Sequence, residues 1–201
     1  MENVTLQNSI NPNDIKQYFK NGVSYDQYRK EMESGLESNQ NDDMRNYIEL
    51  NQHRMNRLDK KLALSQEMIQ SINSLKEKIY WVVLTEHWCG DAAQILPVLA
   101  KIAEQSEGKI ELKLLYRDEN LGLMDNFLTN GGRAIPKLIQ LNDKLEIKKH
   151  WGPRPKTAQE LVIFLKSNPE SAVTYSEQLH KWYAKNNQLD IQKEVATLLQ
   201  F

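Results

Sequence analysis

The sequence predicts an α/β fold, with a central mixed sheet flanked by helices, a helical extension before it and a helical tail after it. Apolar residues recur at helical spacing in the first part of the chain, a strand-helix-strand pattern begins at Ile79, and helical spacing returns beyond Pro169. We therefore divide the chain into a helical extension packed on the core (1–76), an α/β domain (77–168) and a C-terminal helical segment (169–201).

Composition indicates a soluble, cytoplasmic protein. The 201 residues are enough to bury a core without disulfides or metals. Acidic and basic residues nearly cancel, 27 against 26, so charge indicates neither a nucleic-acid partner nor a membrane partner. Residues 1–5 lack the basic and apolar regions of a signal peptide, and no apolar run approaches the ~20 residues that span a bilayer. A single cysteine permits no internal disulfide, which fits a reducing compartment.

The extension is expected to form three helices. Ser24 and Gln27 resemble a capping box that begins the first, and Gly35 with residues 38–41 is expected to end it. The second carries an apolar stripe at three- and four-residue intervals, which we interpret as core packing rather than a partner surface. Its members are Met44, Tyr47, Ile48, Asn51, Met55, Leu58 and Leu62. A third helical stretch at 64–75 leads into the α/β domain.

The α/β domain begins with a run of β-branched and aromatic residues at 79–84, typical of a strand buried on both faces. A helical pattern follows from Ala92 to Ala103 and ends by Gly108. The alternating segment 110–116 then predicts a second strand. Strand, helix and strand in this order imply a parallel pair.

A hairpin completes the predicted sheet. After a short helix at 121–128, Pro136 begins a strand at 137–141, and the chain returns antiparallel at 145–150. A final helix of the domain is expected at 157–165, preceded by two prolines.

No metal site is predicted. The four histidines are scattered, and His87 and Cys89, two residues apart, supply only part of the ligand set that a structural zinc site needs. The chain also lacks a glycine-rich phosphate-binding motif.

Cys89 is the main candidate for chemistry. It follows a buried strand and begins a helix, so its sulfur should lie near unpaired N–H groups and the positive end of a helix dipole, which lowers a thiol pKa. Trp88 before it and Gly90 after it are typical of a partly exposed loop. The alternative is that Cys89 is a small buried hydrophobe, the usual state of a lone cysteine.

The sequence around Cys89 resembles the thioredoxin superfamily over about residues 77–168. The motifs are Trp88-Cys89-Gly90-Asp91, placed between a strand and a helix, and a later Ile135-Pro136 that opens a hairpin strand. Segments 85–92 and 132–139 are similar to little-characterised bacterial thioredoxin family proteins that carry a helical N-terminal extension. The resemblance implies a thioredoxin-like fold, with Cys89 as the attacking cysteine and Ile135-Pro136 as a cis-proline pair that faces the thiol and offers backbone groups to an extended substrate.

Three departures from the thioredoxin pattern affect the chemistry. Ala92 stands where the resolving cysteine would be, so a mixed disulfide on Cys89 needs an outside thiol for release. Val83 stands where thioredoxins place a buried acid that transfers protons. Glu86 is a candidate for that role, and the alternative is that Glu86 is a solvated residue. Asp91 replaces a proline, and its carboxylate either raises the thiol pKa or caps the helix. The sign of the net shift in the thiol pKa therefore stays open.

Arg133 is a candidate partner for the thiolate or for a glutathione carboxylate, because the loop before Pro136 should border the sulfur. The alternative is an exposed loop arginine. Lys137 and His87 are weaker candidates of the same kind, and His87 could exchange a proton with Cys89.

These observations predict a monothiol thiol-disulfide oxidoreductase or thiol-exchange protein, without a cofactor and with glutathione as a candidate co-substrate. Catalysis is assigned to Cys89 and Pro136, and substrate binding to Trp88, Ile135, Arg133, Gly90 and Asp91. The expected partners are protein or low-molecular-weight thiols and disulfides. The alternative function is a redox-inactive thioredoxin-fold module that binds proteins or peptides, and a weaker one is peroxide sensing or reduction.

Overall fold

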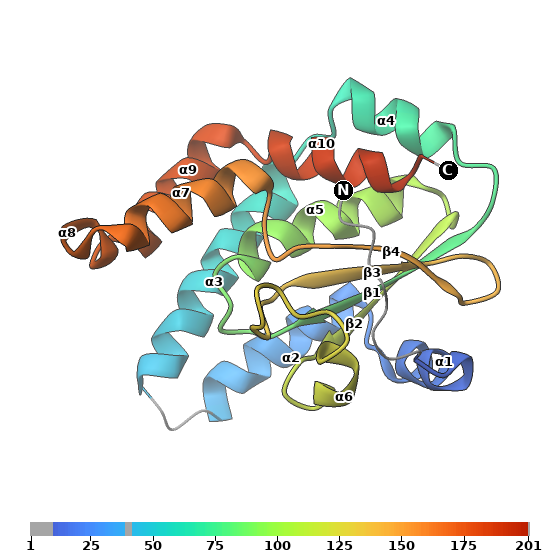
Figure 1. The fold of residues 1–201 in the computed structure, drawn as a ribbon, viewed down its shortest axis with the longest axis horizontal. Coiled ribbons are helices and arrows are strands. Elements are labelled where there is room, and N and C mark those ends of the chain that lie inside the picture. The colour runs from blue at the N-terminus through green and yellow to red at the C-terminus, as the bar shows by residue number, and fades with distance from the viewer. Residues whose placement is uncertain (1–9, 39–41, 201) are drawn as a thin grey trace.

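Figure 1 shows the computed structural model, which describes residues 10–38 and 42–200. Within these ranges four strands form one sheet in the order β2-β1-β3-β4. Their bounds are Ile79–Thr85 for β1, Ile110–Tyr116 for β2, Lys137–Leu141 for β3 and Ile147–Trp151 for β4. β1 pairs parallel with β2 and antiparallel with β3, which pairs antiparallel with β4. The predicted mixed sheet is confirmed.

Helices cover both faces of the sheet (Figure 1). On one face lies α5 (Ala92–Gln105), and α3 (Asp42–Lys61), α4 (Gln66–Asn73) and α10 (Leu189–Leu198) pack against it. On the other face lie α1 (Pro12–Asn21), α2 (Tyr25–Ser38) and α6 (Leu121–Met124). Between β4 and α10 the chain forms α7 (Lys156–Ser167), α8 (Pro169–Ala172) and α9 (Tyr175–Asn186). None of the helices in the described ranges is both long and apolar enough to span a membrane.

One hydrophobic core includes residues from the extension, the sheet and the C-terminal segment, such as Ile48, Trp81 and Leu198. The indole N–H of Trp81 donates to Gln140 Oε1 over 3.0 Å, and Gln140 Nε2 donates to the Leu198 carbonyl over 2.8 Å. These bonds satisfy polar groups that would otherwise be buried without partners. Within the predicted apolar stripe, Ile48 is buried but Tyr47 is 61% exposed, so the prediction for Tyr47 is wrong.

The extension forms the three predicted helices, α2, α3 and α4, and also α1, which was not predicted. Ser24 Oγ accepts the N–H of Gln27 over 3.1 Å, as the capping pattern predicted. Gly35 lies inside α2 rather than at its end. A single glycine costs only about 1 kcal/mol in a helix, which is too little to end one. Residues 1–5 and 39–41, which entered the predictions above, lie outside the described ranges.

Two boundaries of the α/β domain also differ from prediction. α6 ends at Met124 rather than at residue 128, because the next N–H groups make tight turn bonds, such as that from Phe127 to the Met124 carbonyl (2.9 Å). β4 begins at Ile147 rather than at residue 145. Leu145 has a φ of +60° and donates its N–H to the Asn142 carbonyl, so it belongs to the turn.

Candidate active site around Cys89

The loop after β1 places Cys89 at the start of α5. Its N–H donates to the Glu86 carbonyl over 3.1 Å, and its carbonyl accepts the N–H of Ala93 over 3.2 Å. The backbone N–H groups of Asp91 and Ala92 reach the sulfur. The predicted position, with unpaired helix N–H groups directed at the thiol, is therefore present in the structure.

The Ile135-Pro136 peptide bond is cis and lies against the sulfur. Cys89 Sγ donates to the Ile135 carbonyl oxygen over 3.4 Å. Behind this bond lies Gly152, which has a φ of +113°; a Cβ on Gly152 would lie 2.3 Å from the Pro136 carbonyl oxygen. No side chain fits there, so Gly152 fixes how closely β4 approaches the cis proline. The bond that follows, Gly152-Pro153, is also cis.

The thiol of Cys89 is buried, which favours its protonated form. Cys89 itself is 7% exposed, whereas its neighbours Trp88 and Gly90 are partly exposed, as expected for this loop. Burial, followed by the Asp91 carboxylate, raises the pKa of the Cys89 thiol to about 12. The N–H groups at the helix start and, less strongly, the charge of Arg154 lower this pKa, but burial and Asp91 outweigh them. Segments distant in the sequence also contact this loop: Asn51 Nδ2 donates to the His87 carbonyl over 3.0 Å.

Asp91 forms a buried ion pair with Arg154. Arg154 Nε donates to both carboxylate oxygens, over 3.2 and 3.1 Å, and its Nη2 also donates to Oδ2. The hydroxyl of Tyr183 donates to Asp91 Oδ1 over 2.7 Å. Arg154 Nη1 donates to Gln159 Oε1 over 2.8 Å. Asp91 makes no capping bond with its side chain, so of its two expected roles it has the electrostatic one.

Trp88 and Arg133 occupy the outer side of the site. Trp88 is half-buried, and the guanidinium of Arg117 lies 5.0 Å from its ring centroid. Arg133 is exposed and donates from Nε and Nη2 to the two oxygens of Asp125, over 2.7 and 2.9 Å. Arg133 thus has an acidic partner of its own, and the arginine that acts on the Cys89 thiol is Arg154.

His87, Glu86 and Lys137, the weaker candidates from the sequence, have hydrogen-bond partners other than Cys89. His87 Nε2 lies 3.2 Å from the Tyr28 carbonyl and 3.1 Å from the Tyr116 hydroxyl, and burial lowers the pKa of His87. Glu86 accepts the N–H of Asp118 over 2.9 Å, and burial raises the pKa of Glu86. Lys137 is buried and donates to the Thr129 hydroxyl over 2.7 Å.

Arg154 and Tyr183 were missed by the sequence reasoning. Tyr183 carries no local signal, because its role depends on how α9 packs against the start of α5. Arg154 did carry one: it stands between two prolines in Gly152-Pro153-Arg154-Pro155, a stiff segment that fixes the direction of a side chain. Only the prolines of that segment were used in the prediction.

Comparison with known proteins places this geometry in a family. The family model Thioredoxin_9, described as thioredoxin, matches residues 37–187. The chain belongs to the thioredoxin family. This thioredoxin-family chain is 34% identical to thioredoxin 1 of Nostoc sp. and 33% identical to a thioredoxin of Synechocystis sp., each over 70 residues. Those matches cover 35% of this chain and 63% of each relative, so the chain spans less than two thirds of the curated relatives it matches.

Two solved structures share the thioredoxin-like fold over nearly the whole chain. A protein of unknown function from Pseudomonas aeruginosa, PA1234, superposes with a TM-score of 0.60 at 14% identity. An HIV epitope scaffold superposes with a TM-score of 0.62 at 13% identity. Each match covers 92% of this chain and 96% of the other, including the helices before and after the sheet. At this identity the likeness concerns the fold alone.

Proposed function

We propose that this protein is a monothiol thiol-exchange protein, in which Cys89 forms mixed disulfides and an external thiol resolves them. The observation that carries the proposal is the placement of the sulfur, 3.4 Å from the Ile135 carbonyl at the cis proline and within reach of the Asp91 and Ala92 N–H groups. Those N–H groups stabilise a thiolate once it forms. The cis bond presents the Ile135 backbone to an extended substrate.

The exchange proceeds in two balanced steps. Cys89 loses its proton, and the thiolate attacks one sulfur of a disulfide R–S–S–R′, which forms Cys89–S–S–R and releases R′–S⁻ to take up a proton. An external thiolate then attacks the R sulfur, forms a new disulfide with it and returns the Cys89 thiolate, which is reprotonated. Ala92 carries no sulfur, so the second step has no internal route.

The second candidate function is a redox-inactive module that binds proteins or peptides through the surface around Trp88 and Ile135. The raised pKa of the buried Cys89 thiol favours it, because a protonated thiol is a poor nucleophile. The two functions differ in one respect that can be tested, namely whether a covalent adduct forms at Cys89.

Adduct formation with excess glutathione disulfide, followed by intact-protein mass, tests the proposal. We expect the wild-type chain to accumulate one stable mixed disulfide, because it lacks a resolving thiol, and Cys89→Ser to accumulate none. Ala92→Cys is expected to lose the adduct again, since a thiol one helical turn away can attack it and form an internal disulfide. If the folded wild-type chain forms no adduct, the redox-inactive binding module becomes the better explanation.

The rate of Cys89 alkylation, measured against pH, is expected to show the raised pKa of the buried thiol. A folded-state pKa of about 12 leaves far less thiolate at pH 8 than the usual value of about 8.5, so iodoacetamide should react roughly a hundredfold or more slowly with the folded chain than with the urea-denatured chain. The pKa of the Cys89 thiol is higher in the folded chain than in the unfolded chain. The contribution of this thiol to the free energy of unfolding is therefore fully present below about pH 8.5 and is lost as the pH rises toward 12. A folded-state rate that levels off at or below pH 8.5 would contradict the assignment.

A further inference from the structure

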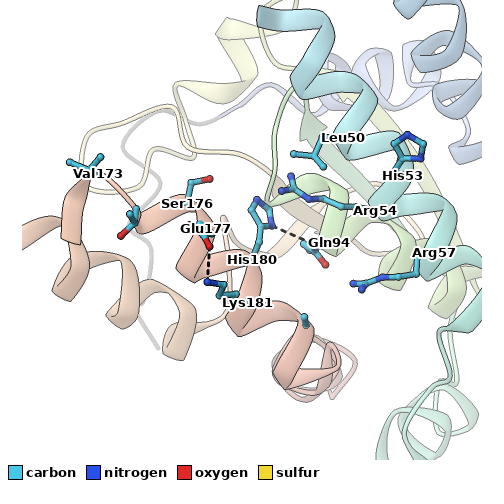
Figure 2. A pocket seen from close by; sticks show the side chains of 12 residues that line it. Leu50, His53, Arg54, Arg57, Gln94, Val173, Ser176, Glu177, His180 and Lys181 are labelled. Carbon is cyan, nitrogen blue, oxygen red and sulfur yellow. Dashed lines mark hydrogen bonds and ion pairs between the residues drawn. The ribbon is translucent and has the colours of Figure 1, made fainter. Parts of the chain in front are cut away.

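A pocket of about 760 Å³ lies between α3 and α9, and polar and charged side chains line part of it (Figure 2). From α3, Arg54 and Arg57 extend toward α9, and from α9 His180 extends toward α3. Gln94, from the first turn of α5, also lines the pocket and is 2% exposed. The pocket adjoins the Cys89 loop at Gly90, where an added Cβ would lie 2.9 Å from His180 Nε2 and 3.6 Å from Arg54 Nη1.

The pocket carries positive charge that its own residues do not neutralise. Neither Arg54 nor Arg57 takes part in an ion pair within the described part of the chain. Arg54 Nη1 donates to the neutral Asn51 Oδ1 over 2.9 Å. The acidic residue in the lining, Glu177, is paired with Lys181 over 2.6 Å. Burial, together with the nearby charge of Arg57, lowers the pKa of Arg54. An anion bound between the two arginines would relieve this repulsion.

Both hydrogen-bond donors and hydrogen-bond acceptors belong to the residues that line this pocket. Gln94 Nε2 lies 3.4 Å from His180 Nδ1, and His180 is neutral at physiological pH because burial lowers its pKa to about 4. With Nδ1 accepting from Gln94, the hydrogen of His180 lies on Nε2, on the side of Gly90 and Arg54. Gln94 Oε1 is buried and has no hydrogen-bond partner among the described residues. The pocket therefore offers donors to a carboxylate and an acceptor to an N–H group.

A ligand that combines a carboxylate with N–H donors is an amino acid or a short peptide. We propose that this pocket binds a small, peptide-like thiol that carries carboxylates, and that this ligand is the external thiol that Cys89 requires. The inference rests on the proposed function. It accounts for the missing second cysteine by placing a binding site for the resolving thiol next to Gly90, whose lack of a side chain leaves room for His180 and Arg54 at the Cys89 loop.

Rates of adduct formation with a charged and a neutral disulfide test this inference. Glutathione disulfide carries the carboxylates, and 2-hydroxyethyl disulfide does not. The double variant Arg54→Gln/Arg57→Gln is expected to react with glutathione disulfide about tenfold more slowly than the wild-type chain and with 2-hydroxyethyl disulfide at an unchanged rate. The matched control is Arg45→Gln/Lys60→Gln, which removes the same charge from exposed positions of α3 outside the pocket lining. If both double variants lose the same rate with glutathione disulfide, or if neither loses any, the proposal that this pocket binds the carboxylates is wrong.

Calorimetric binding of S-methylglutathione, which cannot exchange, separates the pocket from the chemistry. We expect the wild-type chain and Cys89→Ser to bind it and Arg54→Gln/Arg57→Gln to lose at least tenfold in affinity. If neither disulfide reacts with the wild-type chain but this arginine-dependent binding persists, the thiol-exchange function fails and the peptide-carboxylate site stands. If both disulfides react and S-methylglutathione does not bind, the pocket assignment fails and thiol exchange stands.

Discussion

Asp91→Asn is expected to lower the free energy of unfolding by about 3–5 kcal/mol at neutral pH, because it leaves the buried guanidinium of Arg154 without its counter-charge. The side chains of Asp91 and Arg154 are only 9% and 16% exposed, so water cannot replace the lost carboxylate. Asparagine keeps the shape and can still accept the hydroxyl of Tyr183, so the loss reports charge rather than packing. Urea unfolding followed by tryptophan fluorescence measures it.

The matched control for this prediction is Asp125→Asn. Asp125 holds Arg133 with the same two-oxygen geometry, but both side chains are 47% exposed. Exposed ion pairs contribute little because water screens them, so we expect a small change from Asp125→Asn. Equal losses in the two variants would show that burial does not set the strength of the Asp91–Arg154 pair.

Asp91→Asn should also make Cys89 more reactive. The Asp91 carboxylate is the second cause, after burial, of the raised pKa of the thiol, and Arg154 lowers that pKa. Removing the negative charge while the positive charge stays must move the pKa of Cys89 downward. In iodoacetamide alkylation against pH, the profile of the variant is expected to shift toward lower pH. A profile unchanged from the wild-type chain would mean that the carboxylate does not act on the sulfur.

The sheet, the helix after Cys89 and the proline that begins β3 could be predicted because each has a local signal in the sequence, whereas the cis state of the Ile135-Pro136 bond was implied by the family resemblance. The β-branched run of β1 specifies a strand buried on both faces, and Ile135-Pro136 lies at the start of the next antiparallel strand. The placement of Cys89 at the start of α5 followed from the same pattern. The resemblance to the thioredoxin superfamily predicted that the Cys89 sulfur faces the cis Ile135-Pro136 bond. Local periodicity does not specify this contact.

The surroundings of the thiol could not be predicted, because they come from elements far away in the sequence. Cys89 itself is buried although its loop is partly exposed, and the extension contacts that loop through Asn51 while the C-terminal segment contacts it through His180 and Tyr183. No spacing within either segment specifies where it docks on the sheet. The direction of the thiol pKa shift depended on that docking, and so did the choice of Arg154 over Arg133 as the nearby cation.

Gly152→Ala is expected to lower the free energy of unfolding by about 4 kcal/mol or more. Its Cβ would lie 2.3 Å from the Pro136 carbonyl oxygen, a backbone atom that cannot rotate away, and its φ of +113° is unfavourable for any side chain. To relieve the clash, Gly152 and Pro136 must separate, which moves the cis proline that lies against Cys89 Sγ. We therefore also expect faster alkylation of Cys89 at pH 8 in this variant.

Gly108→Ala separates the two causes of that loss. Gly108 also has a positive φ, +89°, but a Cβ there would meet no atom within 4 Å, and it lies beyond the end of α5 that is opposite to Cys89. We expect about 1–2 kcal/mol from the backbone conformation alone and no change in alkylation. The excess loss in Gly152→Ala then measures the contact with Pro136. If the two variants lose the same stability and alkylate at the same rate, the close approach of Gly152 does not hold the cis proline against the thiol.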